Sequence, residues 1–396
     1  MAPAAASSPP PAVGLAFWRD PQALRIAVLQ AVFLLGLGWL AVEAFIHVRA
    51  NMQARGIPTG FGFLNDTAGF DINQSLISYS ATSTYGRAFL VGLLNTCLVS
   101  AISLALATIV GFTVGIARLS KNWAAAQLAT VYVEILRNVP LLLQLLFWYN
   151  AVLKALPGPR QSYALPFGVF LNNRGLFAPE LALGPGAPWL GAALVASAAA
   201  AIAAWWLSRR RRPAMNASLR IGAAALILGP PVAAFLIAGA PLSLVPPELK
   251  GFNFIGGVRL LPEFVALVLG LSLYTAAFIA EVVRAGMQAV PRGQSEAAAA
   301  LGLSRLAAIR HVVAPQAMRV IIPLLTSQYL NLIKNSSLAV FVGYPDLVQV
   351  FAGTVLNQTG AAVQVIFITM AVYLTVSLLA SLAMNLFNRR FASIER

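Results

Sequence analysis

Eight long blocks of apolar residues limit what this chain can fold into. Each is about 20 residues or longer, the length that an α-helix needs to cross a hydrocarbon layer about 30 Å thick. Only 10% of the 396 residues are charged, against roughly 25% in soluble domains, so these blocks do not suit a water-soluble core. The sequence predicts an all-α integral membrane protein with about eight transmembrane helices, near 24–48, 88–117, 126–154, 187–207, 219–242, 262–287, 319–343 and 363–388.

The basic residues predict the orientation of these helices. With the N-terminus in the cytoplasm, alternate loops are cytoplasmic, and those loops carry most of the lysine and arginine for their length. The opposite loops include longer polar stretches. We therefore expect both termini inside, with cytoplasmic charge at Arg118, Lys121, Arg209 to Arg212, Arg292, Arg305, Arg310, Arg389, Arg390 and Arg396.

Several other functions are disfavoured by composition. The net charge of +15 is typical of nucleic-acid binding, but the basic residues occur in short stretches between apolar blocks, as membrane topology requires. One cysteine, Cys97, and two distant histidines, His47 and His311, provide little material for a metal site or a Ser-His-Asp triad. We expect no nucleic-acid partner, no metal site and no catalytic residues in this chain.

Proline and glycine mark the irregular parts of the chain. Pro140 lies within VYVEILRNVPLLLQLLFWY and should kink or interrupt that helix, because it removes a helical hydrogen bond. The outer loop that follows is rich in both residues. The blocks within 187–242 are joined by a basic turn and suggest a simple helical hairpin.

The loop between the sixth and seventh blocks predicts two short helices. Its sequence is AVPRGQSEAAAALGLSRLAAIRHVVAPQAMRV, with Ser295 placed to cap the first helix. Gly302 tolerates the positive φ that ends a helix, and Ser304 can cap the second, which Pro315 should stop. The expected product is a compact helical elbow that projects from the membrane.

This loop resembles the EAA loop of ABC importer permeases, in its Glu-Ala-Ala sequence and in the glycine and proline that follow. In that family the loop forms a coupling helix that docks in a groove of the ATPase. Val312 and Ala314 replace the Ile and Leu that the family favours, which are conservative departures. An ordinary Ala-rich connecting loop is the alternative. The resemblance implies that the ATPase-coupling residues are Glu296, Ala297, Ala298, Gly302, Arg305 and Pro315.

Four further stretches resemble the core of polar amino-acid permeases: LLNTCLVSAISLALATIVGFTVGIARLS, YVEILRNVPLLLQLLFWYN, SLYTAAFIAEVVRAGMQAVPRGQSEAA and LNLIKNSSLAVFVGYPDL. The extra first helix and the insertion resemble the branch that includes AapQ and BztB. The resemblance implies a type I ABC importer permease core in two parts, 88–155 and 262–388, the second including the coupling loop 288–318. The other expected segments are a flexible tail at 1–23, an extra helix and outer loop at 24–87, an insertion at 156–261 and a cytoplasmic end at 389–396.

The same resemblance implies a function and a set of partners. The chain would translocate polar L-amino acids across a bacterial inner membrane, together with a second permease chain, two ATPase subunits and a periplasmic amino-acid-binding protein. ATP and Mg would bind the ATPases, because no GxxxxGK[ST] phosphate loop occurs here. An ion-coupled secondary transporter is the main alternative, although no paired repeat is evident. A membrane enzyme is a third, without a suitable catalytic constellation.

Ionisable residues within the apolar blocks are candidates for the transport path, because each costs roughly 2.5–3.5 kcal/mol at a helix centre. Glu134 and Arg137 share a helical face, as a structural ion pair or as substrate contacts. Glu281 and Arg284 repeat this spacing near the cytoplasmic end and suggest a gate or coupling pair. A polar cluster in the seventh block is expected to line the path or to bond other helices: Gln328, Asn331, Lys334, Asn335, Ser336 and Ser337.

Overall fold

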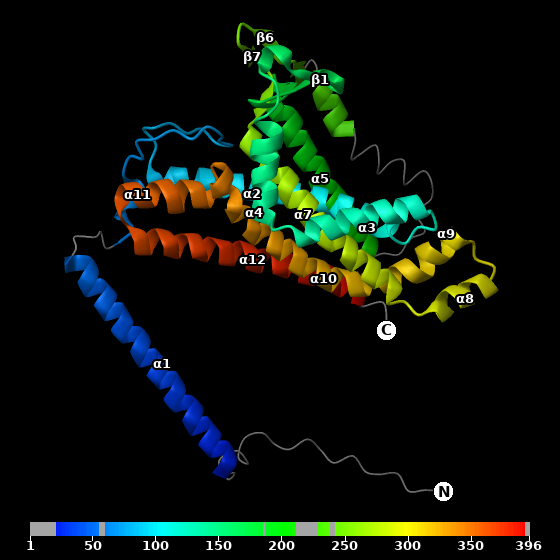
Figure 1. The fold of residues 1–396 in the computed structure, drawn as a ribbon, viewed down its shortest axis with the longest axis horizontal. Helices are drawn as coiled ribbons and strands as arrows, with labels where there is room; N and C mark the ends of the chain where they lie inside the picture. The colour runs from blue at the N-terminus through cyan, green and yellow to red at the C-terminus, as the bar shows by residue number, and fades with distance from the viewer. Residues whose placement is uncertain (1–20, 55–59, 185–186, 211–228, 238–241, 393–396) are drawn as a thin grey trace.

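Long helices dominate the computed structural model, which describes residues 21–54, 60–184, 187–210, 229–237 and 242–392 (Figure 1). Among these residues, five helices are long and apolar enough to cross a membrane, and a bent pair makes six if it is one span. Of the predicted hairpin, α5 (Ala187–Arg210) is helical, while most of its second helix lies outside the described residues. Four of the five candidate spans lie in α1 (Pro21–Ala54), α2 (Tyr85–Ala117), α7 (Pro262–Gln288) and α12 (Ala362–Ala392), and the remaining one, Arg305–Val342, contains α10 (Ala314–Asn335).

Helix α7 is the centre of the bundle and packs against α2, α3 (Trp123–Asn138) and α10. Glycines make the α2 contact close, since a Cβ on Gly111 would lie 2.6 Å from Ile279 and one on Gly115 would lie 2.8 Å from the carbonyl oxygen of Ala280. Small residues of this kind let membrane helices approach until their backbones nearly touch. The two glycines therefore set the distance between α2 and α7.

The predicted break at Pro140 is present. Helix α3 ends at Asn138, and α4 (Leu141–Leu146) with the π-helical turn η3 (Phe147–Leu153) leaves at 106° to it. The side-chain amide of Gln144 donates to the carbonyl oxygens of Leu136 and Val139, at 2.9 Å each. This side chain replaces two hydrogen bonds that the broken helix would otherwise leave open in an apolar setting.

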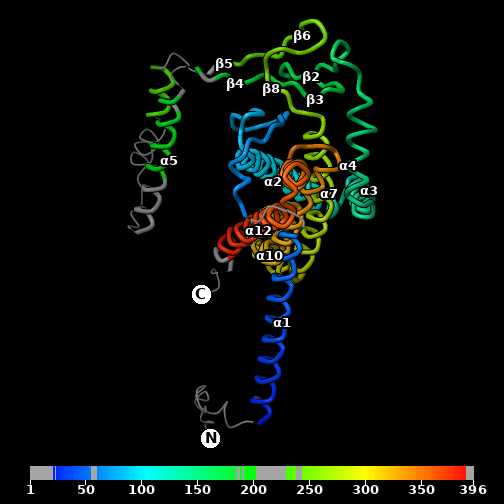
Figure 2. The backbone as a smooth tube through the Cα atoms, turned by 90° about the vertical axis from the view of Figure 1, so that its left-hand side faces the viewer, coloured from blue at the N-terminus to red at the C-terminus, as the bar shows by residue number. Residues whose placement is uncertain are grey.

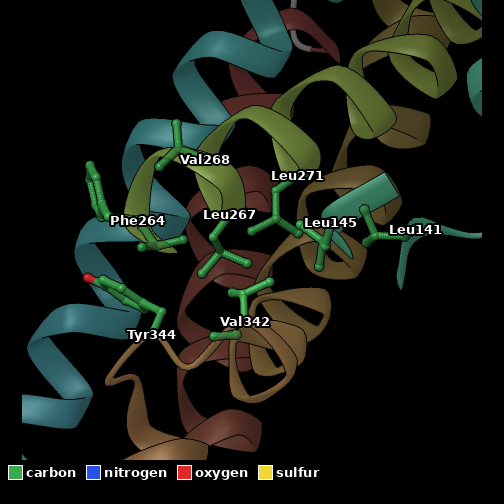
Figure 3. Close-up of a cluster of buried hydrophobic side chains, with 10 residues drawn as sticks. Leu141, Leu145, Phe264, Leu267, Val268, Leu271, Val342 and Tyr344 are labelled. Atoms are coloured by element: carbon green, nitrogen blue, oxygen red, sulfur yellow. The ribbon is translucent and has the colours of Figure 1, made fainter. Parts of the chain in front are cut away.

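A hydrophobic cluster fixes the bent helix to the bundle (Figure 3). Side chains from the first half of α7 meet those of α4 and of the 3-10 turn η7 (Ser336–Val342), with Tyr344 beside them. Close packing of these side chains holds the break in position through van der Waals contacts, the main attraction between apolar surfaces of membrane helices. The labelled members are Leu141, Leu145, Phe264, Leu267, Val268, Leu271, Val342 and Tyr344.

The insertion contains short β-strands that the sequence analysis did not predict. Four of them form one antiparallel sheet in the order β1-β2-β3-β8, and the others pair as β4 with β5 and β6 with β7. Both views place these strands above the start of α7 (Figures 1 and 2). The strands are β1 (Tyr163–Leu165), β2 (Val169–Asn172), β3 (Gly175–Ala178), β4 (Glu180–Leu183), β5 (Leu242–Val245), β6 (Glu248–Lys250), β7 (Asn253–Ile255) and β8 (Val258–Leu260).

Helix α1 stands apart from the other helices (Figure 1). Its most apolar stretch of 18 residues has no residue buried against the rest of the described chain, although Met52 near the end of the helix is buried. A helix with this surface needs lipid or another protein around it.

We expect Gly115→Val to destabilise the bundle by about 1–3 kcal/mol, because the added carbons overlap α7. Thermal denaturation of the detergent-solubilised protein measures the effect. Gly38→Val is the matched control, since a Cβ at Gly38 on α1 meets nothing within 4 Å. Equal thermal stability of the two variants would contradict the proposed α2–α7 spacing.

Candidate functional site

A polar cavity of about 290 Å³ lies between α7 and α10. It opens on the surface of the chain beside the middle of α7 and the C-terminal third of α10, and we call it the central groove. Polar groups at this depth must face protein or water, because lipid offers no hydrogen bonds. The groove is lined by Tyr274, Thr275, Phe278, Gln328, Asn331 and Asn335.

Half of the polar cluster predicted in the seventh block lines this groove. The three amides, Gln328, Asn331 and Asn335, follow one another at helical spacing and share a face of α10. The hydroxyls of Ser336 and Ser337 instead donate to backbone carbonyls three residues earlier, at 2.7 and 2.8 Å. Together with the exposed Lys334, they do not line the groove.

The α7 side of the groove was not singled out from the sequence. Tyr274, Thr275 and Phe278 lie in the stretch SLYTAAFIAEVV, where only Glu281 carries a charge that marks it out. Hydroxyl side chains are common in membrane helices, where they bond to backbone or to other helices. Only the packing of α7 against α10 distinguishes these residues from such ordinary positions.

A charge cluster occupies the end of α7 nearest the elbow. Glu281 forms ion pairs with Arg284 on the same helix and with Arg118 at the C-terminal end of α2. Arg137 of α3 lies 3.8 Å from the same carboxylate. The predicted Glu281–Arg284 pair is therefore present, but within a four-residue cluster that joins three helices.

Glu134 and Arg137 do not form the ion pair that was one of the two alternatives for them. Arg137 turns away from its own helix toward α7, where its guanidinium lies over the Phe278 ring at 5.2 Å and reaches Glu281. Glu134 is exposed and forms no ion pair within the described part of the chain. Because Phe278 lines the central groove, Arg137 contacts both the groove and the charge cluster.

The elbow has the two short helices expected from its sequence. Helix α8 (Arg292–Ala300) is followed by Gly302 at φ +74°, and α9 (Arg305–Ala308) begins after Ser304. The Ser304 hydroxyl accepts from the backbone amide of Ala307 at 3.3 Å. Gly302 is required here because other residues rarely adopt a positive φ.

Two local predictions for the elbow are wrong. Helix α8 begins at Arg292, directly after Pro291, so Ser295 lies inside the helix and does not cap it. Pro315 does not stop the second helix either. The π-helical turn η6 (Ile309–Val313) precedes it and widens the helix. Pro315 therefore fits in the first turn of α10, and the chain stays helical although the proline has no amide hydrogen to donate.

The elbow projects past the ends of α3 and α10 (Figure 1). Ala298 is buried, whereas Leu301 and Leu306 are 81% and 76% exposed. Glu296 and Arg305 are exposed beside them. Large exposed apolar side chains rimmed by charges are typical of a surface that binds another protein.

Comparisons with known proteins identify the family of the chain. Residues 107–393 match the family described as binding-protein-dependent transport system inner membrane component. The chain belongs to this family. It is a multi-pass membrane protein, and the resemblance to ABC importer permeases is confirmed.

Relatives aligned over almost their whole length show which branch of the family the chain resembles. The chain is 49% identical to the general L-amino acid transport system permease protein AapQ of Rhizobium johnstonii, over 93% of this chain and 92% of AapQ. YhdX of Escherichia coli, named as an amino-acid ABC transporter permease, is 51% identical over 93% of this chain and 94% of its own length. BztB of Rhodobacter capsulatus, a glutamate/glutamine/aspartate/asparagine transport system permease, is 40% identical over 94% of both. The expected AapQ and BztB branch is confirmed, and an ion-coupled secondary transporter is not favoured.

We expect Glu281→Gln to reduce the free energy of unfolding by about 1–2 kcal/mol. A fully buried ion pair that loses one partner costs roughly 3–5 kcal/mol, and this cluster is partly exposed. Arg118, whose side chain is 11% exposed, would lose the Glu281 carboxylate as its ion-pair partner. Thermal denaturation measures the change.

Glu134→Gln is the control for this prediction, because Glu134 is an exposed carboxylate on the neighbouring helix without an ion pair in the described residues. If Glu281→Gln were no more destabilising than Glu134→Gln, the cluster would not hold the three helices together.

Proposed function

We propose that this chain is a transmembrane permease subunit of an ATP-binding cassette importer that translocates polar L-amino acids across the bacterial inner membrane. The observation that carries the proposal is one polar groove linked by Arg137 to a charge cluster, at the base of an exposed coupling elbow. The names of AapQ and BztB support amino acids as the substrates. The chain would hydrolyse nothing itself.

A second permease, encoded as a different chain, would close the central groove. Asn331 is exposed at membrane depth, where an amide needs protein or water beside it. A groove open on one side of this chain is suited to become a path between two chains. Apolar α1, uncovered by the rest of the described chain, would face lipid or that partner.

Two ATPase subunits, binding ATP and Mg, would drive the transporter, one of them docked on this elbow. Leu301 and Leu306 provide the apolar contact and Glu296 and Arg305 the charged rim. A periplasmic amino-acid-binding protein would deliver substrate on the opposite side. On this proposal, both termini and the elbow would lie in the cytoplasm and the strands of the insertion in the periplasm.

The elbow is continuous with the wall of the groove. Helix α9, the turn η6 and α10 follow one another without a gap, and α10 carries the groove amides. Movement of the elbow by the ATPase would therefore shift α10 against α7. The charge cluster, which closes the bundle at this end, would have to separate or rearrange for substrate to leave.

We expect Gly302→Val to reduce ATP-dependent uptake at least about tenfold, since a β-branched residue at positive φ costs about 1–3 kcal/mol and would reshape the elbow. The measurement is uptake of radiolabelled L-glutamine by proteoliposomes that contain the complete transporter. Gly293→Val is the control, because Gly293 lies in α8 with open space around its Cα and an ordinary φ. Normal uptake by Gly302→Val would count against the coupling role.

We expect Asn331→Leu to reduce uptake while ATP hydrolysis by the assembled complex continues, because the groove loses a hydrogen-bonding group but the elbow is unchanged. Ser337→Ala is the control, since that hydroxyl bonds only to the backbone carbonyl of Lys334 among the described contacts. Wild-type uptake by Asn331→Leu would exclude the groove as the path.

A further inference from the structure

A second polar cavity, of about 420 Å³, lies at the opposite end of α7 from the elbow. Its wall combines the loop before α2, the β-strands of the insertion, the start of α7 and the turn between η7 and η8 (Val348–Val355). We call it the insertion cavity. Its volume falls within the roughly 300–1,000 Å³ of small-molecule sites. The charged residues in its wall are Asp71, Lys154, Arg174, Arg259 and Glu263.

The two arginines have structural partners. Arg174 Nη1 donates to the side-chain oxygen of Asn253 and, at 3.4 Å, to the carbonyl oxygen of Phe252. Arg259 Nε donates to the carbonyl oxygen of Arg174 at 3.1 Å. These contacts join strands of the insertion. Of the three cations in this wall, Lys154 has the fewest hydrogen bonds among the described residues.

Lys154 and Glu263 are both held by one tyrosine. The Lys154 ammonium lies 4.3 Å from the centre of the Tyr149 ring, a cation–π contact. The Tyr149 hydroxyl donates to Glu263 Oε1 at 2.7 Å. The tyrosine fixes a positive and a negative group in one wall, although they form no ion pair with each other or with another described residue.

Separated opposite charges in a cavity suit a ligand that carries both charges. The wall offers three cations and two carboxylates, so a ligand of one sign would leave the groups of its own sign without a partner. A zwitterion can satisfy both charged groups, with a carboxylate at the lysine and an ammonium at the glutamate. Charge-assisted hydrogen bonds of this kind are about twice as strong as neutral ones.

We propose that the insertion cavity binds the α-carboxylate and α-ammonium groups of an amino acid, through Lys154 and Glu263 respectively, before the substrate enters the central groove. This proposal rests on the proposed function and adds an outer site to it. Tyr149 is a positioning residue for both charges. The side chain of the amino acid would lie toward Asp71 and Gln349, which accept polar groups.

Direct binding tests the proposal without the transport cycle. The complete transporter is reconstituted without ATP and without the binding protein, and binding of radiolabelled L-glutamine is measured by equilibrium dialysis. The competitor is 4-aminobutanamide, which keeps the amine and side-chain amide of glutamine but lacks its α-carboxylate. Wild type should bind L-glutamine at least about tenfold more tightly than 4-aminobutanamide, because one charge-assisted hydrogen bond contributes about that much affinity.

Lys154→Gln should weaken L-glutamine binding about tenfold and remove the preference over 4-aminobutanamide, and Lys154→Arg should restore both. Glu263→Gln should weaken the binding of both compounds. The matched controls are Lys250→Gln and Glu248→Gln, which alter an exposed ion pair on β6 at 3.8 Å, outside the cavity. These two should bind like wild type.

Three outcomes would overturn the outer site: no saturable binding to wild type, unchanged binding in Lys154→Gln and Glu263→Gln, or equal losses in the two controls. A change only in the binding-protein concentration needed for half-maximal uptake would assign these residues to docking and also overturn it. Failure of the wider function is separate, because wild-type proteoliposomes would then show no ATP-dependent uptake.

Discussion

The close approach of α2 to α7 is the contact on which the rest of the bundle depends. Gly111 and Gly115 remove the side chains that would separate the two backbones. With α7 held in this way, α3 and α10 can pack on its other sides, and both the groove and the charge cluster form on the faces that remain. A larger side chain at either glycine would displace the helix that carries Phe278, Glu281 and Arg284.

The apolar surroundings of the helix bundle also require its polar groups to pair with one another. Gln144 bonds the carbonyls freed at the Pro140 break, and Glu281 is shared by arginines from three helices. The first arrangement is local, within nine residues of the chain, whereas the second joins segments that are far apart in the sequence. The amides of the central groove and the charged groups of the insertion cavity face open space, where water or substrate can reach them.

The two ends of α7 have different partners and different chemistry. Near the elbow, Glu281 is neutralised by arginine, and the exposed leucines of the elbow face outward. At the other end, Lys154 and Glu263 are held by Tyr149 without pairing. A path that binds a zwitterion at one end and is closed by an ion cluster at the other suits stepwise passage, with the central groove between them.

The sequence by itself determined the membrane setting, the break at Pro140, the elbow with Gly302 and Ser304, and the permease family. The family follows from the resemblance of the EAA loop and the core stretches. The other three depend on local chemistry: hydropathy over about 20 residues, the missing amide of proline, positive φ at glycine and a side-chain cap. Only the tertiary structure decided that Arg137 pairs with Glu281 and not Glu134, that Tyr274, Thr275 and Phe278 complete the groove, and that short strands of the insertion meet α7. Those features depend on contacts between residues far apart in the chain, which spacing along one helix cannot specify.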